Sequence, residues 1–364
     1  MVNSLFHKLF PLPRYLERRA TGIDISDRSI KYCDLTPDGK QFKLERFGEI
    51  PLPVGVVESG QVKNRPALVE ALAKLRSQLG VVYVAMALPE EPAFVVKLTL
   101  PAMPRANLRS SIELQLEEHV PLPADSLAFD YDIVRCPTPT RNDYDLIVSV
   151  FPKAIMTDYL EATIAAGLVP TSFEIEAQAI ARALIPREEV RPSLVVDFGK
   201  TRTGFFVVSE GKVMATSTVA SVGGEMVTAT IQKNLGLSYE AAESLKIERG
   251  ILQSRSNSLL LFALIPIISV LRDEINKFAS YWDTHGEVGS GDKRLNKIIL
   301  CGGQSTLPGL VEYLSSSLGI KVELGNVWAN ITPKQTKVPP IKFNDSFKYV
   351  ASLGLALKSF DHHD

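Results

Sequence analysis

Short apolar runs alternate with segments of helical periodicity along most of the chain. Apolar residues at spacings of three and four predict an amphipathic helix over 68–80, ended by Gly80, and a buried strand over 81–89. The same criteria predict a mostly helical region over 224–285, and then a strand and a helix within 297–318. Strands that alternate with crossover helices indicate a layered α/β fold.

Two strand–turn–strand segments have the same pattern although they lie nearly half the chain apart. Asp24 in GIDISDRSIK and Asp197 in VVDFGKTRTGF each end a β-branched strand and precede small and hydroxyl residues and a second strand. Such self-similarity predicts two duplicated halves rather than two unrelated domains.

Length and composition limit the class of protein. The 364 residues exceed one ordinary core and predict two domains. With 45% apolar and 22% charged residues, wholesale disorder is excluded. The 40 basic and 41 acidic side chains leave no basic excess to neutralise phosphates. We therefore expect no nucleic-acid partner.

Targeting, membrane and metal signals are weak. The three cysteines lie more than a hundred residues apart without a CxxC pair, which argues against a disulfide framework or a zinc site. Residues 1–19 are interpreted as a leader, with an interfacial anchor as the alternative. The longest apolar run, 259–271, is shorter than the roughly 20 residues that span a bilayer, so we expect it to be a buried core helix. These signals favour a cytoplasmic protein.

The two aspartate turns carry the chemistry that anions and magnesium require. Turns rich in Gly, Ser and Thr present N–H groups and hydroxyls to an anion. Carboxylates such as Asp24 and Asp197 hold Mg²⁺ through its water shell, because Mg²⁺ dehydrates reluctantly. The alternative is two ordinary hairpins with solvated turn residues. The candidate phosphate contacts are Ser26, Arg28, Ser29 and Lys31 in the first turn, and Gly199, Lys200, Thr201 and Thr203 in the second.

Two glycine pairs and one Glu–Lys pair on a helix are further candidate parts of the site. Gly302 and Gly303 lie between an apolar strand and a helix, where they let a flat ligand approach the backbone. Gly223-Gly224 precedes the helix that begins near Met226. In AAESLK, Glu243 and Lys246 lie three apart and share a helical face, which by itself is also typical of a surface ion pair.

The order of these motifs resembles a known superfamily. GIDI-turn-K, VVDFG-turn-T, VGGE, AAESLK and CGGxSxLPGL are similar to the motifs of actin-like nucleotide-binding proteins. Linking segments such as ELQLEEHVPLP and EIEAQAIARAL are similar to the PilM family of type IV pilus assembly proteins, which is related to FtsA. The resemblance covers about 20–358.

The resemblance implies a fold class and a domain organisation. The fold class is α/β, an actin-like, duplicated ribonuclease-H-like two-domain fold around a nucleotide cleft, with a small inserted subdomain. The expected divisions are a leader over 1–19, a first domain over 20–88, 166–190 and 340–360, an inserted subdomain over 89–165, and a second domain over 191–339. Implied cofactors are ATP and Mg²⁺, with Asp24 and Asp197 on the metal.

The resemblance also assigns the remaining site residues. It places Ser26, Ser29 and Lys31 on the first phosphate loop, and Asp197, Gly199 and Thr203 on the second. Gly223 and Gly224 fall near the phosphates and ribose, Glu243 and Lys246 beside the adenosine, and Gly302, Gly303 and Ser305 in the adenine-side loop. Glu174 and Glu176 fall in the connecting helix, which in catalytic relatives orients the attacking water.

One position departs from the family pattern. Ser26 stands where relatives usually have glycine, and its side chain narrows the approach of a phosphate. We therefore expect ATP binding with slow hydrolysis at most.

The implied function is a scaffold that docks on the cytosolic N-terminal tail of a PilN-like membrane protein. The expected groove lies between the inserted subdomain and the first domain, with Phe94, Val96 and Leu98 as candidate walls or as core residues. Other pilus platform proteins and weak self-association are further expected contacts, and the location is cytoplasmic, at the inner membrane through a partner.

Two other functions remain open. A small-molecule kinase needs an acceptor pocket with a general base, for which the sequence has no signature. A nucleotide-free structural homologue, as in type II secretion, is disfavoured by Asp24, Asp197 and the paired glycines.

Overall fold

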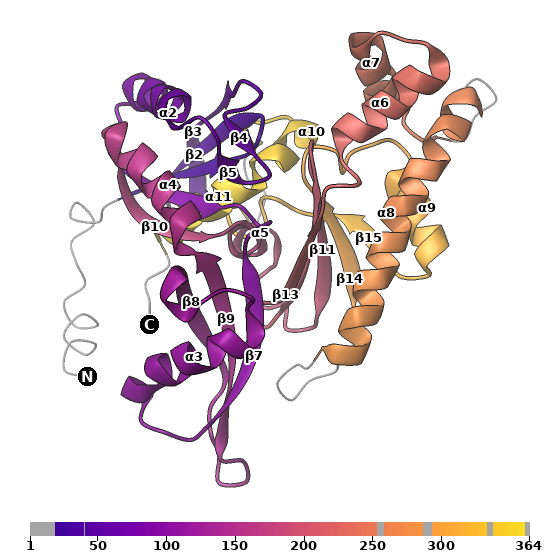
Figure 1. The fold of residues 1–364 in the computed structure, drawn as a ribbon. Helices are drawn as coiled ribbons and strands as arrows, with labels where there is room; N and C mark the ends of the chain where they lie inside the picture. Colours follow the sequence, from indigo (N-terminus) through magenta and orange to yellow (C-terminus); the bar gives the residue numbers. More distant parts are fainter. Residues whose placement is uncertain (1–18, 40, 253–257, 287–292, 333–337, 361–364) are drawn as a thin grey trace.

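A computed structural model of the chain describes residues 19–39, 41–252, 258–286, 293–332 and 338–360. Of the expected leader, only Arg19 lies within these ranges. Two five-stranded sheets and one three-stranded sheet form the framework (Figure 1).

The first sheet has the strand order β10-β6-β1-β2-β3. An antiparallel meander is formed by β1 (Thr21–Ile25), β2 (Ser29–Asp38) and β3 (Gln41–Pro51). On the other side of β1, β6 (Tyr83–Leu88) and β10 (Val169–Ile175) run parallel to it. All five residues of β1 are buried because the strand lies in the middle of the sheet.

The second sheet repeats this path with the order β13-β12-β11-β14-β15. Its meander consists of β11 (Ser193–Phe198), β12 (Thr203–Ser209) and β13 (Lys212–Val219). The parallel strands β14 (Lys297–Cys301) and β15 (Val322–Leu324) follow beyond β11. This shared topology confirms the prediction of two duplicated halves.

A small antiparallel sheet of order β7-β9-β8 lies below the first sheet in Figure 1. Its strands are β7 (Phe94–Pro101), β9 (Asp143–Pro152) and β8 (Leu127–Arg135). Helix α3 (Arg105–His119) buries Leu108, Ile112 and Leu116 against one face. The short 3₁₀ helix η2 (Ala124–Ser126) leads into β8.

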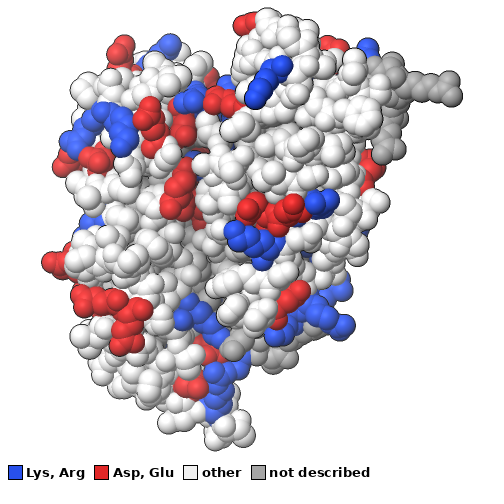
Figure 2. Space-filling view, turned by 45° about the vertical axis from the view of Figure 1, so that its right-hand side comes forward, with Lys and Arg blue, Asp and Glu red and all other residues white. Residues whose placement is uncertain are grey.

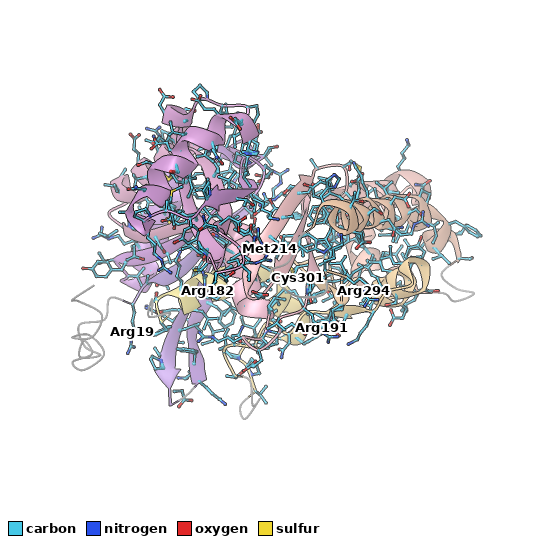
Figure 3. All side chains as sticks on the ribbon, turned by 90° about the horizontal axis from the view of Figure 1, so that it is seen from below. Arg19, Arg182, Arg191, Met214, Arg294 and Cys301 are labelled. Atoms are coloured by element: carbon cyan, nitrogen blue, oxygen red, sulfur yellow. The ribbon has the colours of Figure 1, made fainter. Side chains whose placement is uncertain are left out.

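Two helices lie between the large sheets and join their cores. Residues 350–357 of α11 (Val350–Lys358) are buried, and this helix contacts β1, β2 and α5 (Glu176–Leu184), which in turn contacts β12 and β13. The helices cross at Gly354, where an added Cβ would lie 1.8 Å from the carbonyl oxygen of Ala179. Figure 3 places Arg182 of α5 and Cys301 of β14 near this middle region.

The remaining helices cover the outer faces. On the first sheet, α2 (Arg65–Leu79) begins at the N-cap Asn64, ends at the left-handed Gly80 as predicted, and packs beside α4 (Lys153–Ala165). The outer face of the second sheet packs against α6 (Gly224–Leu235), α8 (Ser258–His285) and α9 (Leu310–Leu318). The other elements are β4 (Val57–Glu58), β5 (Gln61–Val62), α7 (Tyr239–Arg249), α10 (Phe343–Ser346) and η4 (Phe347–Tyr349).

The apolar run 259–271 is a helix, but only one of its faces is buried. Leu264, Ile268 and Leu271 are in the core, whereas Leu259 and Phe262 are 73% and 76% exposed. The run is therefore the expected core helix on one face, while its other face lies outside the core because α8 packs on the sheet from outside. Within the described ranges, no helix has the length and apolar character needed to cross a bilayer.

The domain divisions remain a proposal, to which the packing adds one detail. The small sheet lies within 89–165, while α4, at the end of that range, packs against α2 and β10 of the first sheet.

On the face shown in Figure 2, basic and acidic side chains are interspersed.

Candidate functional site

The two aspartates occupy equivalent positions near the ends of the first strands. Asp24 is the fourth of five residues in β1, and Asp197 is the fifth of six in β11. Burial raises the pKa of Asp24 to about 6, although Lys31 opposes this shift. Burial, together with repulsion by Glu176 and Asp24, raises the pKa of Asp197 to about 7. The structure therefore brings the two predicted carboxylates, Asp24 buried and Asp197 half-buried, close enough to repel each other.

The first turn is organised by Ser26 and Lys31. Lys31 lies opposite Asp24 in the β1–β2 ladder, and its Nζ is 3.5 Å from Asp24 Oδ2 and 3.3 Å from Ser26 Oγ. The Ser26 hydroxyl donates to the Ser29 carbonyl, and the Ser26 N–H donates to the same oxygen. Ser26 thus tightens the turn and accepts from the lysine.

The second turn is held against the start of α6 by backbone contacts. The N–H of Gly199 donates to the Arg202 carbonyl, while Gly224 and Glu225 donate to the carbonyls of Gly199 and Lys200. A Cβ on Gly223 would lie 2.8 Å from the carbonyl carbon of Thr201. Only glycine permits this approach of α6 to the turn.

The loop after β14 touches Asp197 directly. Gly302 has φ +84°, and its added Cβ would lie 2.3 Å from Asp197 Oδ1. Gln304 donates from its N–H to the Phe198 carbonyl, and an added Cβ on Gly224 would clash with its side chain. The Gly302 loop therefore lies against Asp197 and, through Gln304, against Gly224, while Gly303 has only Lys348 Cβ within 4 Å of its added Cβ, at 3.6 Å.

Two predicted hydroxyl contacts are turned into the protein. Thr203 is fully buried and donates from Oγ1 to the Val222 carbonyl. Ser305 is also fully buried and donates to the Gly302 carbonyl. In this structure both side chains stabilise loops rather than face a ligand.

The α7 pair differs from an ordinary surface ion pair. Lys246 is 2% exposed, and its Nζ is 2.7 Å from Glu243 Oε2 and 2.9 Å from Thr228 Oγ1. The same ammonium donates to the Gly224 carbonyl at 3.3 Å. Lys246 therefore fixes α7 to the start of α6.

Sequence reasoning missed Arg202, a cation of the site whose side chain is 11% exposed. It lies in the second turn, but it forms ion pairs with Glu91 (2.7 Å) and with Glu176, both from the first half of the chain. Glu176 begins α5 and raises the pKa of Asp197. The carboxylate predicted to orient water is thus engaged with an arginine.

Glu174 is not in the connecting helix, so that assignment is wrong. It lies in β10, where Arg182 and Lys358 form ion pairs with it. Because the helix begins only at Glu176, the two glutamates belong to different elements and have different partners.

A second ion pair joins the halves at the first turn. The Arg28 guanidinium makes two bonds to the Glu225 carboxylate, at 2.8 and 3.1 Å, although 197 residues separate them. Glu225 was not predicted as a site residue, and Arg28 was predicted to contact phosphate. The observed pair links the β1–β2 turn to α6 across the site.

We expect Arg28→Ala to raise both the association and the dissociation rate of a fluorescent ATP analogue about fivefold. A partly exposed bidentate pair contributes about 1 kcal/mol, and its loss frees the two halves to separate. Stopped-flow kinetics measure both rates, and Glu225→Gln should reproduce the effect. Arg46→Ala, which breaks a pair confined to the first sheet, is the matched control. A rise in Kd for Arg28→Ala alone would instead show direct phosphate contact.

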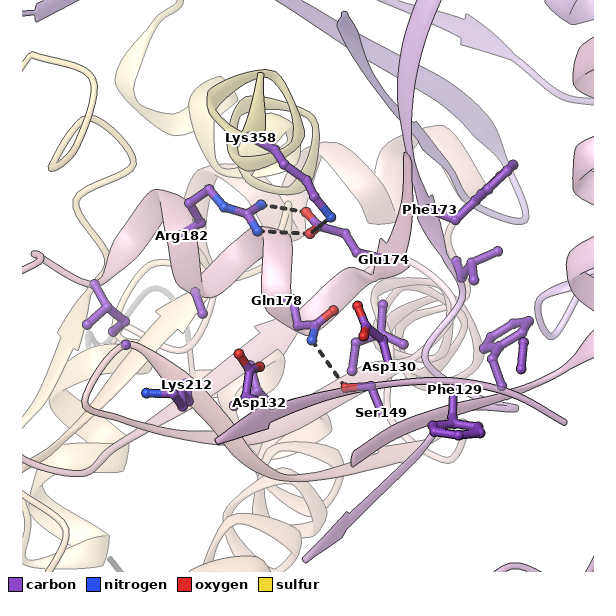
Figure 4. Close-up of a pocket in the computed structure, with 18 of the residues that line it drawn as sticks. Phe129, Asp130, Asp132, Ser149, Phe173, Glu174, Gln178, Arg182, Lys212 and Lys358 are labelled. Carbon is purple, nitrogen blue, oxygen red and sulfur yellow. Dashed lines mark hydrogen bonds and ion pairs between the residues drawn. The ribbon is translucent and has the colours of Figure 1, made fainter. Parts of the chain in front are cut away.

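A groove of about 570 Å³ lies between the small sheet and the first half (Figure 4). Its walls come from β8, β9, β10 and α5, together with the turn between β12 and β13. Phe94, Val96 and Leu98 do not line it. Leu98 is 2% exposed, and all three pack in the core of the small sheet, so the core alternative for these residues is correct.

Comparisons with known proteins identify the family. The family model described as "Type IV pilus assembly protein PilM" matches residues 22–360. The chain belongs to the PilM family. A solved PilM–PilN type IV pilus biogenesis complex is similar to this PilM-family chain with a TM-score of 0.77 and 22% identity, covering 95% of this chain and 100% of that chain.

More distant structures share the PilM-family fold. MreB5 of Spiroplasma citri bound to AMPPNP matches with a TM-score of 0.57 and 12% identity, covering 94% of this chain and 96% of that chain. The ethanolamine utilization protein EutJ from Carboxydothermus hydrogenoformans matches with a TM-score of 0.55 and 17% identity, covering 95% of this chain and 91% of that chain. These similarities confirm the predicted actin-like fold.

The donor set of this PilM-family site fits magnesium held jointly with phosphates. Among the described residues, no three acidic, His or Cys side chains gather as a metal site. Asp24 and Asp197 supply two carboxylates, and Mg²⁺ typically takes one or two with waters and substrate phosphates. Burial raises the pKa of both carboxyl groups although Lys31 and Arg202 oppose the shift, and a bound cation would further favour their charged forms.

Proposed function

We propose that this PilM-family protein is a nucleotide-binding scaffold of type IV pilus assembly. The observation that carries the proposal is that Asp24 and Asp197, from duplicated strands, lie close enough to repel each other, with the glycine loop after β14 packed against Asp197. Two carboxylates thus meet at the junction of the two halves, and one of them adjoins backbone that only glycine can occupy.

In this proposal the chain binds ATP with Mg²⁺ between the two turns. Asp24 and Asp197 hold the hydrated metal, which supplies charge compensation for the phosphates. Lys31, Lys200 and the N–H groups of both turns are the phosphate contacts. Ser29 and Thr201 belong to the same turns, and α7 flanks the nucleoside.

Hydrolysis is proposed to be slow because Glu176, the carboxylate expected to orient the attacking water, is not free. Glu176 is held by Arg202, so orienting a water molecule requires that ion pair to open. Breaking a buried pair leaves an uncompensated charge, which typically costs about 3–5 kcal/mol. The site therefore favours a nucleotide-dependent shape change over rapid turnover.

The groove is the proposed docking site for the N-terminal tail of a PilN-like membrane protein. The groove borders the small sheet and the first large sheet, and the similarity to the PilM–PilN complex supports the partner. A tail that is disordered when free orders on binding in an extended form. Through it the protein would reach the inner membrane, while contacts with other platform proteins and weak self-association remain further proposals.

We expect Ser149→Phe to abolish tail binding while leaving nucleotide binding unchanged. Ser149 lies in β9 and lines the groove, so a phenyl ring there fills space that the tail needs. Calorimetric titration with the synthetic tail of the PilN-like protein from the same organism measures the effect. Ser110→Phe, on the exposed side of α3, is the matched control. Tail binding by the Ser149 variant equal to that of the unaltered protein would place the docking site elsewhere.

A further inference from the structure

We propose that the groove selects a tail by the charge of one side chain: Asp130 and Asp132 receive a lysine or arginine of the tail, next to an apolar end that receives its hydrophobic residues. This inference rests on the proposed docking function and adds the chemistry that the partner must carry.

The geometry of β8 turns both carboxylates toward the groove. Side chains alternate along a strand, so Ala128, Asp130 and Asp132 share one face. Residues Phe129, Tyr131 and Ile133 pack toward the core that α3 covers. Both aspartates are exposed and line the cavity.

These two carboxylates have no cationic partner among the described residues. Asp130 accepts only the N–H of Tyr131, at 3.0 Å, and no hydrogen bond or ion pair is present at Asp132. Glu174, the other carboxylate of the groove, is by contrast saturated by Arg182 and Lys358 (Figure 4). The carboxylates of the groove that have no cationic partner therefore both lie on β8.

The cations that line the groove, Arg182, Arg187, Lys212 and Lys358, all lie on elements other than β8, and two of them are bound to Glu174. Partial desolvation raises the pKa of Asp132, and repulsion by Asp130 adds to the rise, while Lys212 and Lys358 oppose it. Lys212 lies beside Asp132 in Figure 4 without an ion pair between them. A guanidinium or ammonium placed between the aspartates would relieve their repulsion and form charge-assisted hydrogen bonds.

The other end of the groove is apolar. Phe173 of β10 lies there, on the side of Asp130 away from Lys212 (Figure 4). Met156 of α4 and the buried Leu88 also line the cavity. A tail that spans the groove would thus place its apolar residues within a few positions of the basic one.

The test is a titration of the synthetic PilN-like tail against Asp130→Asn/Asp132→Asn. These exposed, isosteric changes remove two charges without filling the groove. We expect affinity to fall about tenfold and its salt dependence to weaken. Glu113→Gln/Glu118→Gln, on the opposite side of the small sheet, removes the same charge and should leave affinity unchanged.

A second arm locates the partner charge. Each Lys and Arg of the tail is replaced in turn by Gln, and we expect one replacement to cost about tenfold against the unaltered protein but nothing against the Asn variant. Lys212→Ala should strengthen binding, because it removes a cation that competes for Asp132.

The outcomes separate this inference from the function on which it rests. If the tail binds the unaltered protein and the Asn variant equally, the charge selection is wrong and the docking function stands. If Lys212→Ala weakens binding and the Asn variant does not, an acidic tail is selected and the inference is overturned. If the tail does not bind the unaltered protein at all, both fail.

Discussion

Asp197→Ala will weaken the binding of ATP with Mg²⁺ by tenfold or more, which is about 1.4 kcal/mol or greater. Asp197 adjoins the second turn and the Gly302 loop, and it lies close enough to Asp24 for the two to repel. No third carboxylate completes a metal site among the described residues, so the alanine variant would leave a single ligand. Isothermal calorimetry with and without Mg²⁺ measures the loss.

Two controls separate loss of the site from loss of the fold. Asp197→Asn should unfold at the same temperature as the unaltered protein or higher, because a neutral side chain removes repulsion with Asp24 and Glu176. The Asp130→Asn/Asp132→Asn variant should bind nucleotide normally. An unchanged affinity in folded Asp197→Ala would remove this account of the cleft.

Gly354→Ala will destabilise the protein by about 3 kcal/mol or more, the upper range for overpacking a core. The new Cβ would lie 1.8 Å from the Ala179 carbonyl oxygen and 2.5 Å from its carbonyl carbon. Both are backbone atoms, so relief requires α11 to move away from α5. Because these helices join the cores of the two large sheets, the damage should extend to both halves.

Urea denaturation followed by circular dichroism tests this expectation. Gly204→Ala is the matched control, because its added Cβ would meet only Asp197 Cβ, at 3.8 Å. The control should unfold within about 1 kcal/mol of the unaltered protein, since a strand residue with room for a methyl group tolerates it. If the two variants proved equally stable, α11 and α5 would not be closely packed at Gly354.

The sequence by itself determined the layered α/β class, the duplication and the position of the two carboxylates. Each depends on local pattern: the spacing of apolar residues, the Gly80 helix end, and a strand ending in Asp24 or Asp197. Such patterns record which side chains an isolated strand or helix must bury, and burial dominates the choice of element. The strand over 41–51 was not predicted, because its side chains do not alternate regularly between buried and exposed.

Only the tertiary structure decided which charges meet. Arg28 forms an ion pair with Glu225, which lies 197 residues away in the sequence. Arg202 forms one with Glu91, which lies 111 residues away. A charged residue in a turn has the same local signature whether it contacts phosphate, water or a distant carboxylate. Its partner is fixed by the packing of the two halves, which no short segment encodes. The same limit explains why the groove walls were predicted on β7, since the face of the small sheet that α3 covers is decided by packing alone.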